Sequence, residues 1–155
     1  MLGEWIIVTP KRAERPFQDS SLECPFCPDN SETGTNWKVL TVENKYSALD
    51  PNIGVLPLDE QYIMEAPAHG HCKVIILSPS HEEQLEQMDE EQVERVFREY
   101  LRVFKELDTK SGIEYVFEFE NRGRAIGVSL DHPHAQVYAL PFLPTRIGQE
   151  LKQFQ

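Results

Sequence analysis

The sequence is poor in cysteine and in basic residues, and it has no long apolar run. Three cysteines in 155 residues cannot build a disulfide scaffold, and two of them form a Cys-x-x-Cys pair, which favours a metal or redox site in a reducing compartment. Fifteen Lys and Arg stand against 26 Asp and Glu, so a net charge of −11 argues against nucleic acid as a partner. No apolar run approaches the ~20 residues that cross a bilayer, so no membrane partner is expected.

The beginning of the chain also lacks a basic region followed by an apolar stretch. We therefore expect no secretory leader and a cytoplasmic location. Apolar residues make up 40% of the chain and charged residues 26%, which is typical of a globular protein. Because internal repeats and linkers are absent, residues 1–155 are expected to form a single domain.

One long helix dominates the expected secondary structure. Residues Asp89–Leu107 place apolar side chains at helical spacing, and Asp89 is expected to cap the helix N-terminus. The face that this spacing assigns to the core consists of Val93, Val96, Phe97, Tyr100, Leu101, Phe104 and Leu107. A short amphipathic tail helix is expected to carry Ile147, Leu151 and Phe154.

Shorter elements are predicted around this helix. Ser80 followed by Glu83 resembles a capping box and predicts a helix over His81–Met88. Runs rich in β-branched and aromatic residues predict strands at Trp5–Val8, Val39–Val42, Gln61–Glu65, Lys73–Leu77, Tyr115–Glu120 and Gln136–Leu140. One long helix on a mostly antiparallel sheet is an α+β fold.

Cys24 and Cys27 lie in a long irregular segment. Cys-x-x-Cys lets both sulfurs face one tetrahedral metal ion, and such an ion would order a segment that has little core of its own. A thioredoxin-like redox pair is the alternative, but that motif opens a helix, and Pro28-Asp29-Asn30-Ser31 is a poor helix start. The residues alone leave the histidine ligands open among His69, His71, His81 and His132.

A second polar cluster lies near the C-terminus. Side chains alternate along a strand, so His132, His134 and Gln136 would share one face, while alanine and valine side chains take the other. Three polar side chains in a row would be costly in a core, so this face is expected to line a site. An imidazole there can act as nucleophile, base or metal ligand, and a purely metal-binding role for both histidines is the alternative. The glycine-interrupted residues 120–129 would suit phosphate oxygens.

Six motifs in a fixed order point to one family. They are Gly3-Glu4-Trp5-Ile6-Ile7-Val8-Thr9-Pro10-Lys11-Arg12-Ala13-Glu14-Arg15-Pro16, Cys24-Pro25-Phe26-Cys27-Pro28, Val42-Glu43-Asn44-Lys45-Tyr46-Ser47-Ala48-Leu49, Ser78-Pro79-Ser80-His81, Phe119-Glu120-Asn121-Arg122-Gly123 and His132-Pro133-His134-Ala135-Gln136. Together they closely resemble the N-terminal half of the galactose-1-phosphate uridylyltransferases, in the histidine-triad superfamily, over essentially the whole chain. The resemblance implies a histidine-triad-like antiparallel half-barrel with the long helix packed on it.

The resemblance also implies a reaction. In the family, UMP passes from UDP-glucose to galactose 1-phosphate through a uridylyl-histidine. His134 matches the nucleophile, and Gln136 matches the glutamine that hydrogen-bonds the transferred phosphoryl group. The positions that match further substrate-binding residues are Arg12, Arg15, Asn44, Asn121 and Ser129. The implied partners are a UDP-sugar and a sugar 1-phosphate.

A zinc site and a missing half follow from the same resemblance. The family's zinc ligands fall on Cys24, Cys27, His81 and His132, which implies a structural zinc. We expect the chain to represent the first half alone, without the second half and the homodimer partner of the full-length enzymes. Ala135 stands where glycine is common, which leaves two alternatives: a phosphorylase of ADP-glucose or other NDP-sugars, and a zinc-stabilised nucleotide-binding module without turnover.

Overall fold

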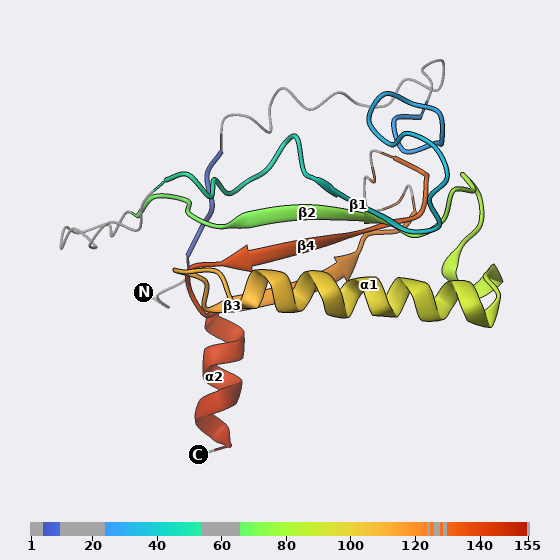
Figure 1. Cartoon of the computed structure of the whole chain (residues 1–155). Helices are drawn as coiled ribbons and strands as arrows, with labels where there is room; N and C mark the ends of the chain where they lie inside the picture. Colours follow the sequence, from blue (N-terminus) through green and yellow to red (C-terminus); the bar gives the residue numbers. More distant parts are fainter. Residues whose placement is uncertain are drawn as a thin grey trace.

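A four-stranded antiparallel sheet carries the long helix on one face. The computed structural model describes residues 5–9, 24–53, 66–123, 125, 128 and 130–154. The strands, in their spatial order, are β1 (Leu40–Glu43), β2 (His71–Ile76), β4 (His134–Leu140) and β3 (Tyr115–Glu120). Figure 1 shows helix α1 (Glu90–Asp108) lying along the sheet and helix α2 (Thr145–Gln153) pointing away from it. The α+β architecture expected from the sequence is confirmed.

Strand β4 connects the core with the polar cluster. All its residues are buried, because it lies between β2 and β3 and both of its faces are covered. Ala135, Val137 and Ala139 join the main core beneath α1, whereas His134 and Gln136 alternate with them and face the other side of the sheet. The predicted division into a core face and a polar face is confirmed for His134 and Gln136, whereas His132, expected on the same face, lies before the strand begins.

Helix α1 begins where the sequence predicted. The side chain of Asp89 accepts a hydrogen bond from the backbone N–H of Gln92 at 2.7 Å, which is an N-cap. Gln92 is itself buried, and its side-chain amide donates to the carbonyl oxygens of Lys38 and Leu77, at 2.8 and 2.7 Å. The helix start is thereby fixed to the end of β2 and to the segment before β1.

The predicted core face of α1 is only partly correct. Val96 and Leu107 are fully buried as expected, but so is Val103, which the pattern had left out. Three residues assigned to the core are exposed, namely Phe97, Leu101 and Phe104. The apolar arc of the helix is wider than the strip that the sheet covers, so one flank of the arc stays on the surface.

The strand predicted at Trp5–Val8 is wrong. Residues 5–9 are extended, yet they pair with no strand of the described part of the chain. Trp5 stacks on Phe142, with ring centroids 5.7 Å apart, while Ile6 and Val8 are 83% and 80% exposed. Residues 5–9 therefore form an extended segment with one side packed against the rest of the domain, and they do not form a strand at the edge of the sheet.

The helix predicted at His81–Met88 is also wrong. Only a 3-10 turn, η2 (Leu85–Gln87), forms there. The carboxylate of Glu83, expected to complete a capping box, instead accepts a hydrogen bond from the Ser78 hydroxyl at 2.6 Å. The strand predicted at Gln61–Glu65 lies outside the described residues. Neither helix in the described ranges is long and apolar enough to cross a membrane.

Candidate metal centre and adjoining histidine site

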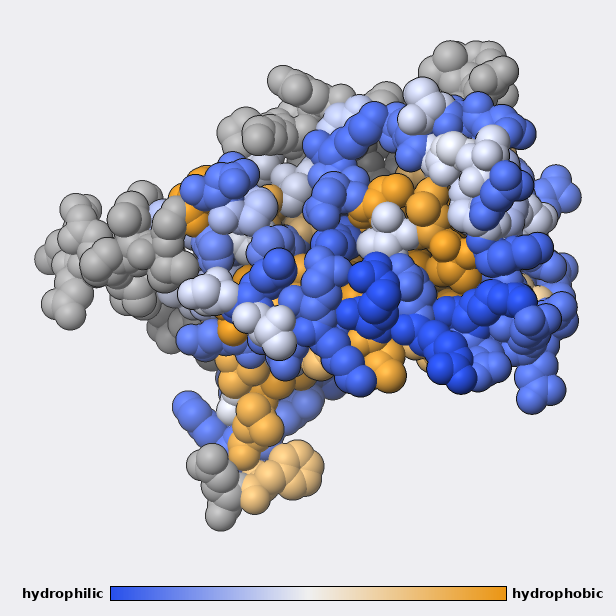
Figure 2. All heavy atoms as spheres, viewed as in Figure 1, coloured by the Kyte–Doolittle hydropathy of each residue, from blue (hydrophilic) through white to orange (hydrophobic). Residues whose placement is uncertain are grey.

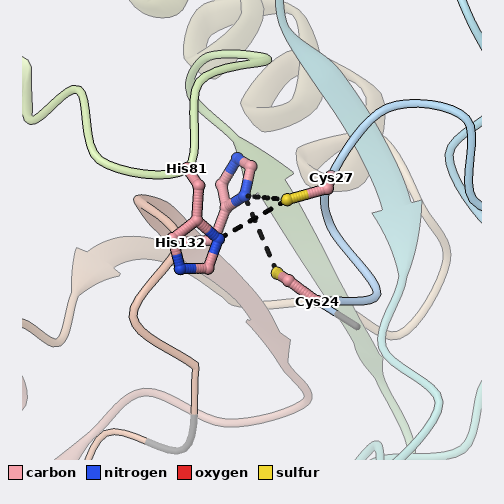
Figure 3. A group of neighbouring side chains, drawn as sticks. All are labelled: Cys24, Cys27, His81 and His132. Carbon is pink, nitrogen blue, oxygen red and sulfur yellow. Dashed lines mark hydrogen bonds between the residues drawn. The ribbon is translucent and has the colours of Figure 1, made fainter. Parts of the chain in front are cut away.

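Four metal-ligating side chains meet beside the start of β4. Cys24 and Cys27 come from the irregular segment before β1, His81 from the loop after β2, and His132 from the residues just before β4. Their ligand atoms all lie within 4.8 Å of one another. Figure 3 shows the two sulfur atoms facing the two imidazole rings. Three segments that are far apart in sequence thus converge on one point.

The distances in this Cys2His2 cluster match a tetrahedral zinc site. Zinc-to-sulfur bonds of about 2.3 Å and zinc-to-nitrogen bonds of about 2.05 Å place sulfur and nitrogen about 3.6 Å apart. The Cys27 sulfur lies 3.5 Å from Nδ1 of His81 and 3.7 Å from Nδ1 of His132. The Cys24 sulfur lies 3.8 Å from Nδ1 of His132. The cluster therefore fits zinc, and four protein ligands would leave no coordination position for a substrate.

His132 is held in the tautomer that a metal requires. Its Nε2–H donates to the backbone carbonyl of Ser78 at 2.8 Å, so Nδ1 presents its lone pair to the sulfurs. Burial lowers the pKa of His132, which keeps the ring neutral. Burial, together with the neighbouring Cys24, raises the pKa of Cys27 to about 11, so a metal would displace a proton when it binds this sulfur.

His134 opens β4 immediately after the metal-ligand segment. Its Nδ1–H donates to the backbone carbonyl of His132 at 2.7 Å, which puts the lone pair of the ring on Nε2. The side chain is only 6% exposed, so the ring is held in place by its surroundings. A neutral imidazole oriented in this way is suited to attack an electrophile. One residue, His132, thus offers a candidate metal ligand with its ring and orients His134 with its backbone carbonyl.

Phe26 connects the metal cluster with His134. It stands between the two cysteines, and its ring makes edge contacts with His132 and His134, at centroid distances of 6.2 and 5.2 Å. Phe26 and Cys24 also pack on the buried side chains of β2. The loop that carries the two thiols therefore forms part of the surroundings of His134. Sequence reasoning missed this role, although Phe26 lies inside the Cys-x-x-Cys motif.

A cavity of about 380 Å³ opens beside the two histidines. It is lined by Gln84, Glu120, Asn121, Arg122, Gly123, Val128, Leu130, Asp131, His132, Pro133 and His134. Among these lining residues, Arg122 is the permanent cation, and its guanidinium forms a two-pronged ion pair with Glu86 of η2. Gly123 has a φ of +90°, which glycine adopts without strain and which turns the chain after β3. The cavity combines polar and apolar lining groups and is wide enough for a small phosphorylated ligand.

The other residues expected at the site take different positions. Gln136 is buried two residues after His134 on the same face of β4, and Asn121 lines the cavity. Asn44 is not in the lining of this cavity, and its side chain accepts a hydrogen bond from the backbone N–H of Tyr46 at 3.0 Å in the turn after β1. Three expected substrate-binding residues lie outside the described residues: Arg12, Arg15 and Ser129.

His69 and His71 lie at the opposite end of the sheet from the cluster. His71 pairs with Ala139 near the end of β4, five positions from the pair that His134 forms, which corresponds to roughly 16 Å along a strand. Both ring nitrogens of His69 face backbone carbonyls, those of Ile53 at 2.7 Å and Ser111 at 3.3 Å. Of the four histidines that the residues alone left open, the structure brings His81 and His132 to the thiols.

The fold and the site define a class of protein, an α+β domain in which a Cys2His2 cluster adjoins a histidine-bearing strand. The chain belongs to the galactose-1-phosphate uridyl transferase family, because the family model for the N-terminal domain matches residues 1–144. This confirms the family that the six motifs indicated.

The chain is similar both to uridylyltransferases and to a phosphorylase. A galactose-1-phosphate uridylyltransferase of Thermotoga maritima is 34% identical over 148 residues, which cover 95% of this chain and 46% of that protein. A solved uridylyltransferase structure superposes with a TM-score of 0.80 at 31% identity, covering 98% of this chain and 47% of its own. An ADP-glucose phosphorylase from Arabidopsis thaliana, solved with bound ADP-glucose, superposes with a TM-score of 0.70 at 28% identity. The match covers 94% of this chain and 50% of the phosphorylase chain. The chain thus spans about half the length of these relatives.

Proposed function

We propose that this chain is the nucleophile-bearing half of a nucleotidyltransferase that moves UMP from UDP-glucose to galactose 1-phosphate. In the first step, Nε2 of His134 attacks the α-phosphorus of UDP-glucose. A phosphorus–nitrogen bond forms, and the bond to the bridging oxygen breaks, so glucose 1-phosphate leaves with the electron pair. In the second step, a phosphate oxygen of galactose 1-phosphate attacks the same phosphorus. UDP-galactose forms, and the electron pair returns to Nε2.

The observation that carries this proposal is the hydrogen bond from Nδ1 of His134 to the carbonyl of His132, at 2.7 Å. It holds the proton on Nδ1, so that the attacking lone pair lies on Nε2 at neutral pH. As the nucleotidyl group is attached, the same carbonyl can stabilise the positive charge that develops on the ring. Gln136, on the same face of β4, is the residue we assign to hydrogen-bond the transferred phosphoryl group.

A zinc ion held by Cys24, Cys27, His81 and His132 would supply rigidity and no reactive group. The ring of His132 and the backbone carbonyl that orients His134 belong to the same residue. Fixing that ring therefore also fixes the acceptor of the His134 hydrogen bond. We assign the metal a structural role on this ground.

ADP-glucose phosphorylase activity is the second candidate. It is favoured by the similarity to the Arabidopsis thaliana phosphorylase, which matches 94% of this chain. The first step would be the same, with an adenylyl group on His134, but inorganic phosphate would be the acceptor. The two candidates therefore differ in the base of the donor and in the second nucleophile.

Intact mass spectrometry distinguishes these candidates. The zinc-loaded chain is incubated separately with UDP-glucose and with ADP-glucose, and the covalent adduct is measured. We expect a mass increase equal to a uridylyl group, loss of this group on addition of galactose 1-phosphate, and no adduct in His134→Asn. His71→Asn is the matched control, because His71 lies at the far end of the sheet, and it should retain the adduct. An adenylyl adduct discharged by inorganic phosphate would support the phosphorylase instead.

A further inference from the structure

Arg122 lies where the cavity beside His134 meets the turn η2. It belongs to the loop that follows β3, and it lines the cavity together with Gln84, the N-cap residue of η2. Its guanidinium pairs with the carboxylate of Glu86, in the middle of η2. Figure 2 shows mostly hydrophilic surface at the end of α1 that η2 precedes, on the right of the view. A ligand recognised at this margin of the cavity therefore meets polar and charged groups.

The ion pair between Arg122 and Glu86 contributes little to the stability of the fold. Their side chains are 51% and 58% exposed, and ion pairs so open to water are weakened by solvation and by salt. The effect of the pair is geometric, because two parallel hydrogen bonds hold the guanidinium in one orientation. An arginine that is already oriented loses less conformational freedom when it binds a further anion.

The contact with Glu86 uses only the end of the guanidinium. Nη1 of Arg122 donates to Oε2 of Glu86 at 2.8 Å, and Nη2 donates to Oε1. A guanidinium has five N–H donors, so this contact leaves three of them. Two of the three, the Nε–H and the second N–H of Nη2, point in the same direction along one side of the group. This side forms a second fork, which matches two oxygens of a phosphate.

Arg122 also supplies the charge that a phosphate needs in this cavity. Glu120 and Asp131, which line the same cavity, are acidic. Burial raises the pKa of Glu120, the charge of Arg122 lowers it, and the charge of Glu86 raises it further. Arg122, Glu86 and Glu120 are therefore close enough to act on one another. Because carboxylates repel a phosphate, its binding here depends on the permanent cation.

We propose that Arg122 binds the phosphate of a sugar 1-phosphate through the free side of its guanidinium, while Glu86 holds the end of the same group and positions it. The choice of this phosphate rests on the proposed function, in which His134 and Gln136 act on the transferred phosphoryl group. The phosphate of glucose 1-phosphate, which leaves in the first step, then still needs a cation.

The register of the sheet supports this assignment. Glu120 pairs with Ala135, the residue after His134, and Arg122 follows two residues later in the loop after β3. Arg122 is thus a neighbour of the attacking ring on the adjacent strand, where the second phosphate of a nucleotide sugar can lie. The same glucose 1-phosphate leaves from UDP-glucose and from ADP-glucose, so the inference applies to both candidate functions.

Titration calorimetry of the zinc-loaded chain with glucose 1-phosphate tests this proposal without requiring turnover. Arg122→Gln removes the fork and should raise the dissociation constant by at least about tenfold. The dissociation constant of UMP, whose phosphate takes the place beside His134, should change by less than about threefold, because a more distant charge is screened. Arg98→Gln on α1 is the matched control, since it removes the same charge from an exposed arginine paired with Glu94. It should leave both dissociation constants unchanged.

Glu86→Gln separates positioning from competition. This variant keeps the size of the side chain but removes its charge and one of the two acceptors for Arg122. If Glu86 positions the guanidinium, glucose 1-phosphate should bind more weakly, although the chain has lost a negative charge. If Glu86 instead competes with the phosphate for the same donors, glucose 1-phosphate should bind more tightly, and this result would overturn the proposal.

Three other results would also overturn it: no measurable binding of glucose 1-phosphate to the unsubstituted chain, unchanged binding to Arg122→Gln, or equal weakening by Arg122→Gln and Arg98→Gln. Unfolding in urea should show that these variants keep the stability of the unsubstituted chain, because the altered side chains are exposed. The proposed reaction fails separately. A missing adduct on His134 contradicts the reaction, whereas the dependence of glucose 1-phosphate binding on Arg122 is measured without it.

Discussion

Removing the metal from the Cys2His2 cluster is expected to destabilise the chain and to disturb His134 indirectly. Residues 24–39 form turns and bends without a helix or strand. They are held by a few turn hydrogen bonds and by the packing of Cys24 and Phe26 on the buried side chains of β2. Once the ion is lost, the loop keeps its turn hydrogen bonds and this packing but loses the bonds to the metal, so Phe26 is held less firmly against the ring of His134.

The size of the effect follows from linkage between metal binding and folding. An ion present at about 100 to 1,000 times its Kd stabilises the folded state by about 2.7 to 4.1 kcal/mol. In a domain of this size, each kcal/mol shifts the Tm by about 2 to 4 °C. Chelation is therefore expected to lower the Tm by about 5 to 16 °C. The yield of the nucleotidyl adduct should fall with it, because the carbonyl of His132 then orients His134 less firmly.

Metal content, thermal unfolding and adduct yield can be measured on one preparation. Elemental analysis should give one zinc per chain, and both the Tm and the adduct should recover when zinc is restored after chelation. Cys24→Ser should lose the zinc, whereas Cys72→Ala should retain it, since Cys72 is buried but lies outside the cluster. The reasoning is refuted if Cys24→Ser keeps both its zinc and its Tm, or if chelation leaves the Tm unchanged.

Three further predictions concern the packing of α1 and β3. Val103→Ala removes a fully buried side chain and should lower the free energy of unfolding by about 2 kcal/mol, whereas Leu151→Ala on the surface should change it by less than about 0.5 kcal/mol, both measured in urea. Gln92→Ala removes the side-chain donor to the carbonyls of Lys38 and Leu77, of which the Leu77 bond is buried, and should cost about 1 to 3 kcal/mol in the same assay. Burial raises the pKa of Glu118 in the folded chain, so this carboxyl ionises more easily when the chain is unfolded. The free energy of unfolding therefore falls as the pH rises from the pKa of Glu118 in the unfolded chain to its pKa in the folded chain. Glu118→Gln should therefore be more stable than the unsubstituted chain at pH 7, and a pH series of unfolding curves should show this gain disappearing below about pH 4.3; an equal gain at every pH would contradict the assignment.

The elements predicted correctly are those whose signals are local in the sequence. Helix α1 has a capping residue and a long apolar period, and strands β3 and β4 have alternating or continuous apolar runs. The helix expected at His81–Met88 failed because Glu83 bonds Ser78, a competition that the four-residue pattern cannot show. The pattern of α1 located its apolar arc but not its orientation, because the width of the sheet beneath it decides that Val103 is buried and Leu101 exposed.

The sequence alone indicated only part of the candidate metal site. Cys-x-x-Cys marked two ligands by its spacing, but spacing could not select the histidines, which lie 54 and 105 residues from Cys27. The family resemblance implied His81 and His132, and the structure brings these same two rings to the sulfurs. Contacts between distant segments, such as Phe26 against His134 or the Ser78 carbonyl against His132, have no sequence signal of their own.

The central claim is that His134 is a nucleophile for a nucleotidyl group. The most direct measurement is the location of that group after the zinc-loaded chain has reacted with UDP-glucose. Tandem mass spectrometry can locate the modified peptide, and phosphorus NMR can identify the bond. We expect one uridylyl group, joined through a phosphorus–nitrogen bond to His134. A group on any other residue, or no covalent group on a folded and zinc-loaded chain, would contradict the account.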